Sequence, residues 1–262
     1  MPTYNRFIAF GDSITEGLSD IQVNGVYLGW ADRVAQALGR ESGQCEYFNL
    51  AIRGKRLEQV VEDQLPLGMP YVDGADTLVS FHAGANNILR PGYDPSSLLP
   101  MYSHAAQSIA STGAHLLLFT VQEIQNPQSR TQSLWNQRFG PFNENVRQTA
   151  RDTGAYLLDG NTVPVFFDRR LISADRLHLN EEGHRRVAAA VLEKLGLPHD
   201  LDWREPLGEM PHQSVLNRIS NTASWTSSFL VPWTLRRLTG KSSGDGRKPK
   251  HTEPVTILAA ID

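Results

Sequence analysis

The fold of this protein is set close to its N-terminus by the stretch Arg6-Phe7-Ile8-Ala9-Phe10-Gly11-Asp12-Ser13-Ile14-Thr15-Glu16-Gly17. The apolar run up to Phe10 predicts a buried β-strand, and the glycine after it predicts a turn. Ser13 then falls near the start of the next helix, where unpaired backbone amides polarise a hydroxyl group. We therefore expect Ser13 beyond the carboxyl end of a strand, which is where parallel sheets carry their functional groups.

The same pattern of apolar runs and amphipathic segments recurs along the first 200 residues. The apolar runs predict five strands, over residues 6–10, 46–50, 77–81, 115–121 and 155–159. The amphipathic segments predict helices over residues 29–38, 56–64, 96–111 and 142–153, and a closing helix over residues 180–195. Asn180 followed by two glutamates is typical of a helix start. Strands that alternate with helices predict an α/β fold, with a mostly parallel sheet covered on both faces.

Length and composition fit one α/β domain with an appendage. The chain has 262 residues, of which 40% are hydrophobic and 20% charged, as in ordinary globular proteins. Its single cysteine, Cys45, excludes an internal disulfide and a thiolate zinc cage. Residues 1–200 carry 17 Lys and Arg against 22 Asp and Glu, so the body lacks the concentrated basic face of a nucleic-acid binder. No apolar signal core precedes the first strand and no run of ~18 apolar residues occurs, so we expect a cytoplasmic protein.

Three residues have the side chains that serine catalysis requires. A serine nucleophile needs a base to take its proton and an acid to orient that base. Asp175-Arg176-Leu177-His178 places an acid three residues before a histidine, just ahead of the closing helix. In a turn, this separation lets the carboxylate reach the imidazole Nδ1, so that the other ring nitrogen faces Ser13. The serine loop is not a Gly-x-Ser-x-Gly elbow, because Thr15 stands where the second glycine would be.

Two further loops carry candidate donors for an oxyanion. Asn49-Leu50-Ala51-Ile52-Arg53-Gly54 follows the second predicted strand and presents the N–H group of Gly54. Gly84-Ala85-Asn86-Asn87 follows the third strand and presents the side-chain amide of Asn86. Acyl transfer needs such donors where negative charge develops on the carbonyl oxygen. Taken singly, each loop also fits a plain turn.

Together these four segments resemble the SGNH hydrolases, also called GDSL-type esterases and lipases, over roughly residues 6–195. The resemblance implies a three-layer α/β/α sandwich with a five-stranded parallel, flavodoxin-like sheet. It implies Ser13 as the nucleophile, His178 as the base and Asp175 as the orienting acid. The oxyanion hole would combine the backbone N–H groups of Ser13 and Gly54 with the amide of Asn86. No cofactor and no metal ion is implied.

The segments depart from the family pattern at two positions. Ile14 replaces a leucine, which conserves bulk. Asn87 replaces the usual aspartate, and we expect this change to alter how its loop is braced without changing the chemistry. Among the neighbouring residues, we interpret His82 as a hydrogen-bonded loop histidine and Asp12 as a brace for the serine turn. His184 falls within the closing helix and lacks a convincing set of partners for a metal site.

The chain is predicted to divide into a hydrolase domain over residues 1–197 and an irregular C-terminal extension over residues 198–262. Aromatic and apolar residues of the extension precede a series of basic residues, namely Trp225, Phe229, Leu230, Val231, Trp233, Arg236, Arg237, Lys241, Arg247, Lys248 and Lys250. This combination could dock on an anionic membrane surface. We favour instead an extension that packs on the body to about residue 238 and is flexible beyond it, because residues 239–254 are rich in Gly, Ser, Lys and Arg.

The sequence predicts a serine esterase that hydrolyses a small or acetylated ester through an acyl-enzyme intermediate, since no long hydrophobic lid is visible. One alternative is a catalytically idle or weak hydrolase-fold protein whose basic, aromatic tail engages a partner or a membrane. Another is a phosphate-binding module that uses residues 11–15, although this loop lacks the lysine of a P-loop and the glycines of a dinucleotide site. We expect a small-molecule ester and no nucleic acid as partner, and the sequence carries no signal for an oligomeric state.

Overall fold

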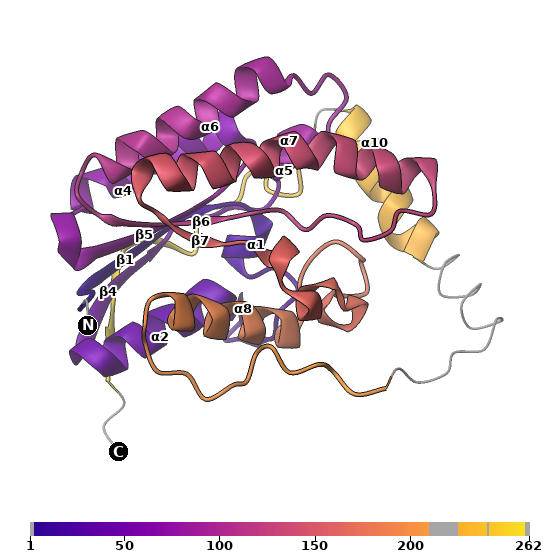
Figure 1. Ribbon diagram of the computed structural model, residues 1–262. Helices are drawn as coiled ribbons and strands as arrows, with labels where there is room; N and C mark the ends of the chain where they lie inside the picture. The colour runs from indigo at the N-terminus through magenta and orange to yellow at the C-terminus, as the bar shows by residue number, and fades with distance from the viewer. Residues whose placement is uncertain (1–2, 210–224, 240, 260–262) are drawn as a thin grey trace.

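The computed structural model describes residues 3–209, 225–239 and 241–259. Among these residues, six strands form the central sheet in the order β7-β6-β5-β1-β4-β8 (Figure 1). The strands are β1 (Arg6–Gly11), β4 (Gln44–Asn49), β5 (Thr77–His82), β6 (His115–Phe119), β7 (Tyr156–Leu158) and β8 (His251–Leu258), and a small hairpin joins β2 (Gln22–Val23) to β3 (Val26–Tyr27). The first five are mutually parallel, which confirms the five predicted strands with ends that differ by no more than two residues.

Helices cover both faces of the sheet and make three layers (Figure 1). The helices are α1 (Ser13–Glu16), α2 (Trp30–Ser42), α3 (Leu57–Gln59), α4 (Leu65–Gly68), α5 (Ala85–Ile88), α6 (Pro95–Ala110), α7 (Arg130–Thr153), α8 (Glu181–Lys194) and α10 (Val231–Leu238). Short 3-10 turns lie at Met69–Tyr71, Gly74–Asp76, Gly160–Thr162, Pro164–Phe167 and Arg169–Leu171. α2 and α8 lie on one face of the sheet, and α6 and α7 lie on the other. The predicted α/β sandwich is confirmed.

The central strand β1 contributes to both cores. Phe7 and Ala9 enter the core beneath α2 and α8. Ile8 and Phe10 enter the core beneath α6 and α7. Because successive side chains of a strand point to opposite faces, a strand covered on both sides must be apolar at every position. This requirement explains the continuous apolar run that precedes Gly11.

Three predicted helices differ in extent from the observed ones, and the smallest difference is in α2, which ends at Ser42, four residues after the predicted end. α7 begins at Arg130, twelve residues before the predicted start, and continues through Gly140 and Pro141. Proline removes one backbone hydrogen bond from a helix interior, but the buried Phe139 and Phe142 hold the helix against the core on both sides of the interruption. The segment predicted as one helix over residues 56–64 is the short α3 followed by a π-helix, η1 (Val60–Gln64), which leads into α4.

The closing helix α8 starts at the residue predicted as its cap. The side chain of Asn180 accepts a hydrogen bond from the backbone N–H of Gly183 at 3.0 Å. Its amide group donates to the carbonyl of Arg170 at 2.7 Å. The cap thereby attaches the start of α8 to the preceding loop, two residues after His178.

The C-terminal extension adds a sixth strand that the sequence did not predict. β8 pairs antiparallel with β4, within the region expected to be flexible. Lys250 anchors this strand, since its Nζ lies 2.6 Å from Asp32 Oδ2, and both side chains are almost entirely buried. An uncovered edge strand exposes unpaired backbone groups, and β8 satisfies those of β4. The part of the extension at residues 210–224 and the side chains of Leu230, Trp233 and Arg237 lie outside the described residues.

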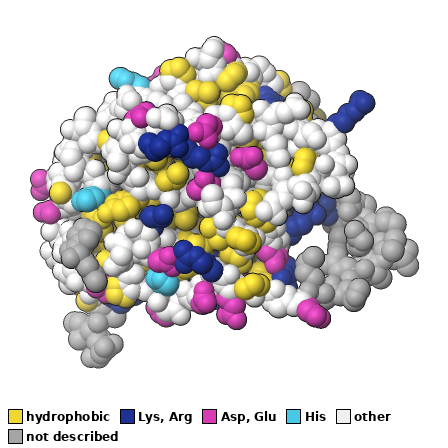
Figure 2. Space-filling view, viewed as in Figure 1, with side chains coloured by type: hydrophobic (Ala, Val, Ile, Leu, Met, Phe, Trp, Pro, Cys, Tyr) yellow, Lys and Arg dark blue, Asp and Glu magenta, His cyan; other side chains and the backbone are white. Residues whose placement is uncertain are grey.

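Hydrophobic, basic and acidic side chains are interspersed on the face of the molecule shown in Figure 2. Lys and Arg side chains lie next to hydrophobic ones around the centre of this face (Figure 2). Within the described ranges, no helix combines the length and the apolar character that a membrane crossing needs.

Candidate active site

The turn after β1 presents Ser13 at the first position of α1. Gly11 has a φ of +155°, and a Cβ atom there would lie 2.6 Å from the carbonyl oxygen of His82, so a larger residue does not fit. Asp12 caps the helix, because its carboxylate accepts from the N–H of Ile14 at 3.4 Å. The glycine and the cap together hold the Ser13 hydroxyl at the carboxyl edge of the sheet.

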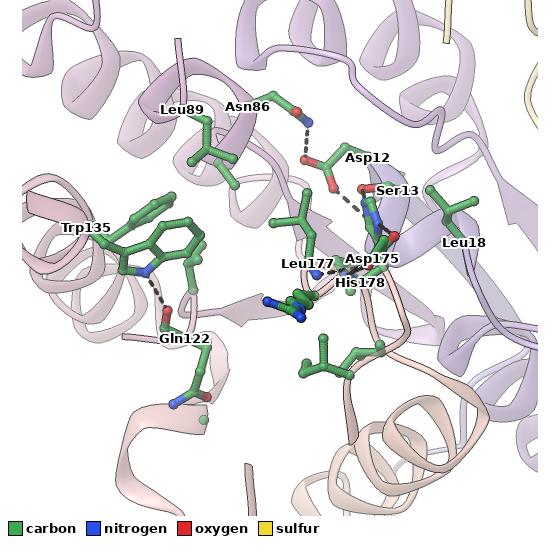
Figure 3. A pocket seen from close by; sticks show the side chains of 18 of the residues that line it. Asp12, Ser13, Leu18, Asn86, Leu89, Gln122, Trp135, Asp175, Leu177 and His178 are labelled. Carbon is green, nitrogen blue, oxygen red and sulfur yellow. Dashed lines mark hydrogen bonds and ion pairs between the residues drawn. The ribbon is translucent and has the colours of Figure 1, made fainter. Parts of the chain in front are cut away.

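The structure brings together the three predicted catalytic residues (Figure 3). His178 Nε2 lies 2.9 Å from Ser13 Oγ. On the other side of the ring, His178 Nδ1 lies 2.6 Å from Asp175 Oδ2. Ser13 and His178 each have 8% of their surface exposed. A hydroxyl, an imidazole and a carboxylate therefore form one hydrogen-bonded line, which is the geometry of an activated nucleophile.

Asp175 is held in the ionised form by its own turn. Burial raises the pKa of this carboxyl, but the hydrogen bond and charge of His178 outweigh it and bring the pKa well below its usual range. Asp175 Oδ1 accepts from the backbone N–H groups of Leu177 and His178, each at 2.9 Å, and from the Ser173 hydroxyl at 2.7 Å. The carboxylate is thus both charged and fixed in direction toward the imidazole.

The predicted oxyanion donors Gly54 and Asn86 line the pocket of Ser13, and the side-chain amide of Asn86 already donates to protein acceptors. Gly54 lies in the loop after β4 with a φ of +75°. The side-chain amide of Asn86 donates to Asp12 Oδ2 at 2.8 Å and to the carbonyl of Lys55 at 3.1 Å. Burial raises the pKa of Asp12, against the opposing effects of His82, Ile14, His178 and Asn86. Asp12 thus holds Asn86 as well as capping α1.

Asn87 braces its loop through two contacts. Its side-chain oxygen accepts from the N–H of Leu57 at 2.8 Å, and its amide nitrogen donates to Glu58 Oε2 at 2.7 Å. An aspartate could accept from Leu57 but would face the Glu58 carboxylate with a like charge. Asn87 therefore avoids the charge repulsion that an aspartate at this position would have with Glu58 on α3.

The two histidines near the site have different surroundings. His82 lines the pocket with its ring centre 5.4 Å from that of Phe119. Burial lowers its pKa, partly offset by the charge of Asp12, and its Nδ1 has no hydrogen-bond partner among the described residues. His184 lies in α8 and does not line the pocket, and both its ring nitrogens contact backbone groups, the N–H of Trp30 and the carbonyl of Leu18.

The serine opens into a pocket of about 870 Å³. Aromatic and aliphatic side chains from α5, α7 and the loops that follow the strands form much of its wall, among them Leu89, Phe119, Trp135, Phe139, Phe166 and Leu177. Trp135 lies across the pocket from Asp175 and His178 (Figure 3). Its indole N–H donates to the carbonyl of Gln122 at 3.0 Å. Sequence reasoning missed Trp135 and Phe139, because both lie in the part of α7 that was not predicted.

The C-terminal extension also reaches the site, which the sequence did not predict. The indole N–H of Trp225 donates to the backbone carbonyl of Asp175 at 2.7 Å. The guanidinium of Arg176 lies over the Trp225 ring, 4.6 Å from its centre. Further along, Phe229 and Arg236 line the pocket. The only sequence signal for this arrangement was the concentration of aromatic and basic residues in the extension.

Comparisons with known proteins agree with this geometry. Residues 9–186 match the GDSL-like Lipase/Acylhydrolase family. A psychrotrophic esterase, EstA, from Pseudoalteromonas sp. superposes with a TM-score of 0.57 at 17% identity, over 73% of this chain and 97% of that one. The acetylxylan esterase Axe2 from Geobacillus stearothermophilus gives a TM-score of 0.54 at 19% identity, over 78% and 99%. A G-D-S-L family protein from Veillonella parvula gives 0.56 at 21% identity, over 72% and 96%.

No curated protein sequence matches the chain. The solved structures share the fold at identities too low to transfer a substrate. The family match, in contrast, covers more than half of the chain and includes the segments of Ser13 and Asn86. The chain belongs to the GDSL-like lipase/acylhydrolase family and is a carboxylic-ester hydrolase.

Proposed function

We propose that this protein is a serine esterase that hydrolyses a small or acetylated ester through an acyl-enzyme intermediate. The observation that carries the proposal is the line from Ser13 Oγ through His178 to Asp175, with separations of 2.9 and 2.6 Å. These distances lie within the hydrogen-bond range that proton transfer requires. The carboxylate, held ionised, stabilises the imidazolium that forms when His178 accepts a proton.

In the acylation half, Ser13 Oγ attacks the ester carbonyl while its proton passes to His178 Nε2. A bond forms between Oγ and the carbonyl carbon, and the carbonyl electron pair moves to the oxygen. When the tetrahedral intermediate collapses, the bond to the alcohol oxygen breaks and His178 returns the proton to that oxygen. The alcohol leaves, and the acyl group remains on Ser13.

In the deacylation half, water replaces the alcohol and the same transfers run in the opposite direction. His178 takes a proton from water as the water oxygen attacks the acyl carbon. The bond to Ser13 Oγ then breaks, and the proton on His178 returns to Oγ. The carboxylic acid is released and the enzyme is regenerated without a cofactor.

The oxyanion is assigned to the backbone N–H groups of Ser13 and Gly54 and to the amide of Asn86. The amide hydrogens of Asn86 are directed at Asp12 and at the carbonyl of Lys55. The substrate oxygen therefore has to replace one of these acceptors, and the longer contact, to Lys55 at 3.1 Å, is the weaker of the two. The stronger contact to Asp12 then keeps the amide plane in place during the reaction.

The substrate class draws support from relatives of the same fold. Axe2 is described as an acetylxylan esterase, and one catalytic mutant of it replaces a serine with alanine. The ester class proposed for this chain is accordingly a small acyl group, with acetyl as the first candidate. A binding protein without activity would not require the low pKa of Asp175 or its alignment with His178.

The proposal is tested by hydrolysis of p-nitrophenyl esters from acetyl to long acyl chains, with the native protein and a Ser13→Ala variant. We expect the variant to lose activity by about 10⁴-fold or more on every ester. Ser108→Ala changes a half-buried serine on α6 whose hydroxyl donates to the carbonyl of His104 in the same helix, and it serves as the matched control. Activity retained in a folded Ser13→Ala variant would exclude the serine mechanism.

A further inference from the structure

Four basic side chains that line the pocket have no ion-pair partner among the described residues, namely Arg90, Arg169, Arg236 and Lys241, and three of these come from the end of α5 and from the C-terminal extension. Arg90 follows α5, while Arg236 and Lys241 come from the C-terminal extension, and all three line the pocket of Ser13. Among the described residues, none of these three side chains makes an ion pair or a hydrogen bond. We call Arg90, Arg236 and Lys241 the basic wall.

The acidic side chains of the pocket do not neutralise the basic wall, because each is engaged elsewhere. Asp175 contacts His178, Asp12 contacts Asn86, Asp168 pairs with Arg170, and Glu123 accepts from the amide of Asn143. No ion pair among the described residues neutralises the three cations of this wall, and the carboxylates of Glu58 and Asp245 act on Arg90 only from outside the pocket lining. A positively charged cleft attracts anionic ligands and raises their local concentration.

The basic wall lies beside the loops that carry the proposed oxyanion donors. Ser242, next to Lys241, packs so closely on Gly54 that its hydroxyl would lie 2.1 Å from a Cβ atom at that glycine. Arg90 lies two residues after the end of α5, which carries Asn86. Burial lowers the pKa of Arg90 and the charge of Arg56 lowers it further, against the opposing charges of Glu58 and Asp245. The Nε of Arg90 is buried without a hydrogen-bond partner among the described residues. An anion at this position would satisfy that nitrogen.

Arg236 reaches the pocket from the helical segment that spans residues 226–238. Phe229 lines the pocket seven residues earlier, and residues at this spacing lie on one face of a helix. The same segment begins at Trp225, which contacts the backbone of Asp175. The extension thus contacts the loop of Asp175 through Trp225 and the loop of Gly54 through Ser242. Between these contacts it contributes Phe229 and Arg236 to the pocket lining.

We infer that this site takes an ester whose acyl or alcohol half carries a carboxylate or phosphate group, held by the basic wall of Arg90, Arg236 and Lys241. The inference rests on the proposed function and specifies its substrate class. Guanidinium groups bind carboxylate and phosphate through two parallel hydrogen bonds, and a lysine adds a point charge. A neutral acetylated sugar would leave this wall unused.

The test compares matched esters that differ only in charge. In the alcohol half, 4-acetoxybenzoate and 4-acetoxyphenyl phosphate are compared with neutral methyl 4-acetoxybenzoate. In the acyl half, the p-nitrophenyl ester of succinate monoanion is compared with its methyl-capped form. The readout is the ratio of kcat/KM for the anionic ester to kcat/KM for the neutral one, in the native protein and in Arg236→Gln and Lys241→Gln. Comparing ratios between variants removes the difference in intrinsic ester reactivity.

We expect this ratio to fall about five- to tenfold in each variant for at least one of the anionic esters, because a hydrogen bond to a charged group contributes on that scale. The ratio should also fall as salt is raised, since the wall is partly open to solvent. Lys248→Gln removes a charge from the same extension at an exposed position outside the pocket, and the ratio should stay unchanged. Ratios that are equal in all four proteins would overturn the inference.

A binding measurement separates this inference from the proposed function. Calorimetric titration of Ser13→Ala with 4-acetoxybenzoate and with its methyl ester measures anion recognition without turnover. Tighter binding of the anion, weakened by Arg236→Gln in the same background, supports the basic wall even if no ester is hydrolysed. Equal binding of the two compounds, together with hydrolysis of the neutral ester by the native protein, would refute the basic wall and leave the esterase proposal standing.

Discussion

The buried His184 makes the stability of this protein depend on pH below neutrality. His184 is entirely inaccessible to solvent, and its Nδ1 accepts from the backbone N–H of Trp30 at 3.3 Å. Its Nε2 lies 3.3 Å from the carbonyl of Leu18. The two contacts require a neutral imidazole that carries its proton on Nε2. Protonation of Nδ1 would break the contact with Trp30 and place a charge in the apolar core beneath α2 and α8.

Burial is the main reason why the pKa of His184 falls from 6.5 to about 3. The hydrogen bond to Leu18 opposes this effect, while the charges of Arg33, Lys250 and His178 add to it. Between these two pKa values the unfolded chain binds a proton that the folded protein does not, so folding becomes less favourable as the pH decreases. The contribution is fully present above the unfolded pKa and is lost progressively below it.

The expected change follows from the pKa difference. At about pH 5 the unfolded histidine is roughly 1.5 pH units below its pKa, while the folded one is still neutral. At ~1.4 kcal/mol per unit, the free energy of unfolding falls by ~2 kcal/mol between about pH 7.5 and about pH 5. This figure barely depends on the exact folded pKa, provided that it stays below about 4.

Urea unfolding at several pH values, with the native protein and a His184→Gln variant, measures this contribution. Glutamine does not titrate, so the native protein should lose ~2 kcal/mol more than the variant over the same pH interval. The difference in slope is the readout, and it is independent of the variant's stability at neutral pH. Nitrogen NMR of the native imidazole should also show the neutral form at about pH 5. Equal slopes, or a protonated imidazole in the folded protein at that pH, would refute the reasoning.

Three further substitutions test other parts of the structure. Asp175→Asn is expected to lower kcat for p-nitrophenyl acetate by about 10⁴-fold with a small effect on KM, because an amide cannot stabilise the His178 imidazolium; a loss below about tenfold would contradict the orienting role. Lys250→Met leaves the carboxylate of Asp32 buried without its cation and is expected to reduce the free energy of unfolding by ~3 kcal/mol. Urea unfolding measures this loss, hydrogen exchange should locate it in β8, and a change within about 0.5 kcal/mol would argue against a structural anchor. Gly54→Ala introduces a Cβ at a φ of +75° and 2.1 Å from a hydroxyl of the extension; kcat/KM should fall at least about tenfold, and unchanged kinetics would show that the loop is not constrained.

Short-range patterns in the chain were sufficient for the parallel sheet and for the residues of the catalytic line. β1 is buried on both faces and appears as a continuous apolar run, whereas β4 and β5 are largely buried runs that include polar residues; the end of each run marks a functional loop. Asp175 and His178 lie in one turn, and their spacing alone allows the contact at 2.6 Å. The approach of His178 to Ser13, 165 residues earlier in the chain, followed once both loops were assigned to the same edge of the sheet.

The first half of α7 could not be predicted from its own residues. Gly140 and Pro141 disfavour a continuous helix, and the segment before them has few apolar residues. The helix persists because Phe139 and Phe142 pack on a core built from other elements. Since Trp135 and Phe139 belong to this half, the size and apolar character of the pocket also emerged only from the folded molecule.

The C-terminal extension depends most strongly on long-range packing. The polar, glycine-rich composition of residues 239–254 predicts flexibility, yet Lys250 pairs with Asp32, 218 residues earlier. Trp225 lies in the part that we expected to pack on the body, and it donates to Asp175, 50 residues earlier. These partners exist only after the body has folded and has left one edge of β4 unpaired and one side of the pocket open. The residues of the body thus specify a hydrolase through local patterns, whereas the composition of the pocket wall is decided by contacts between distant segments, which no local periodicity encodes.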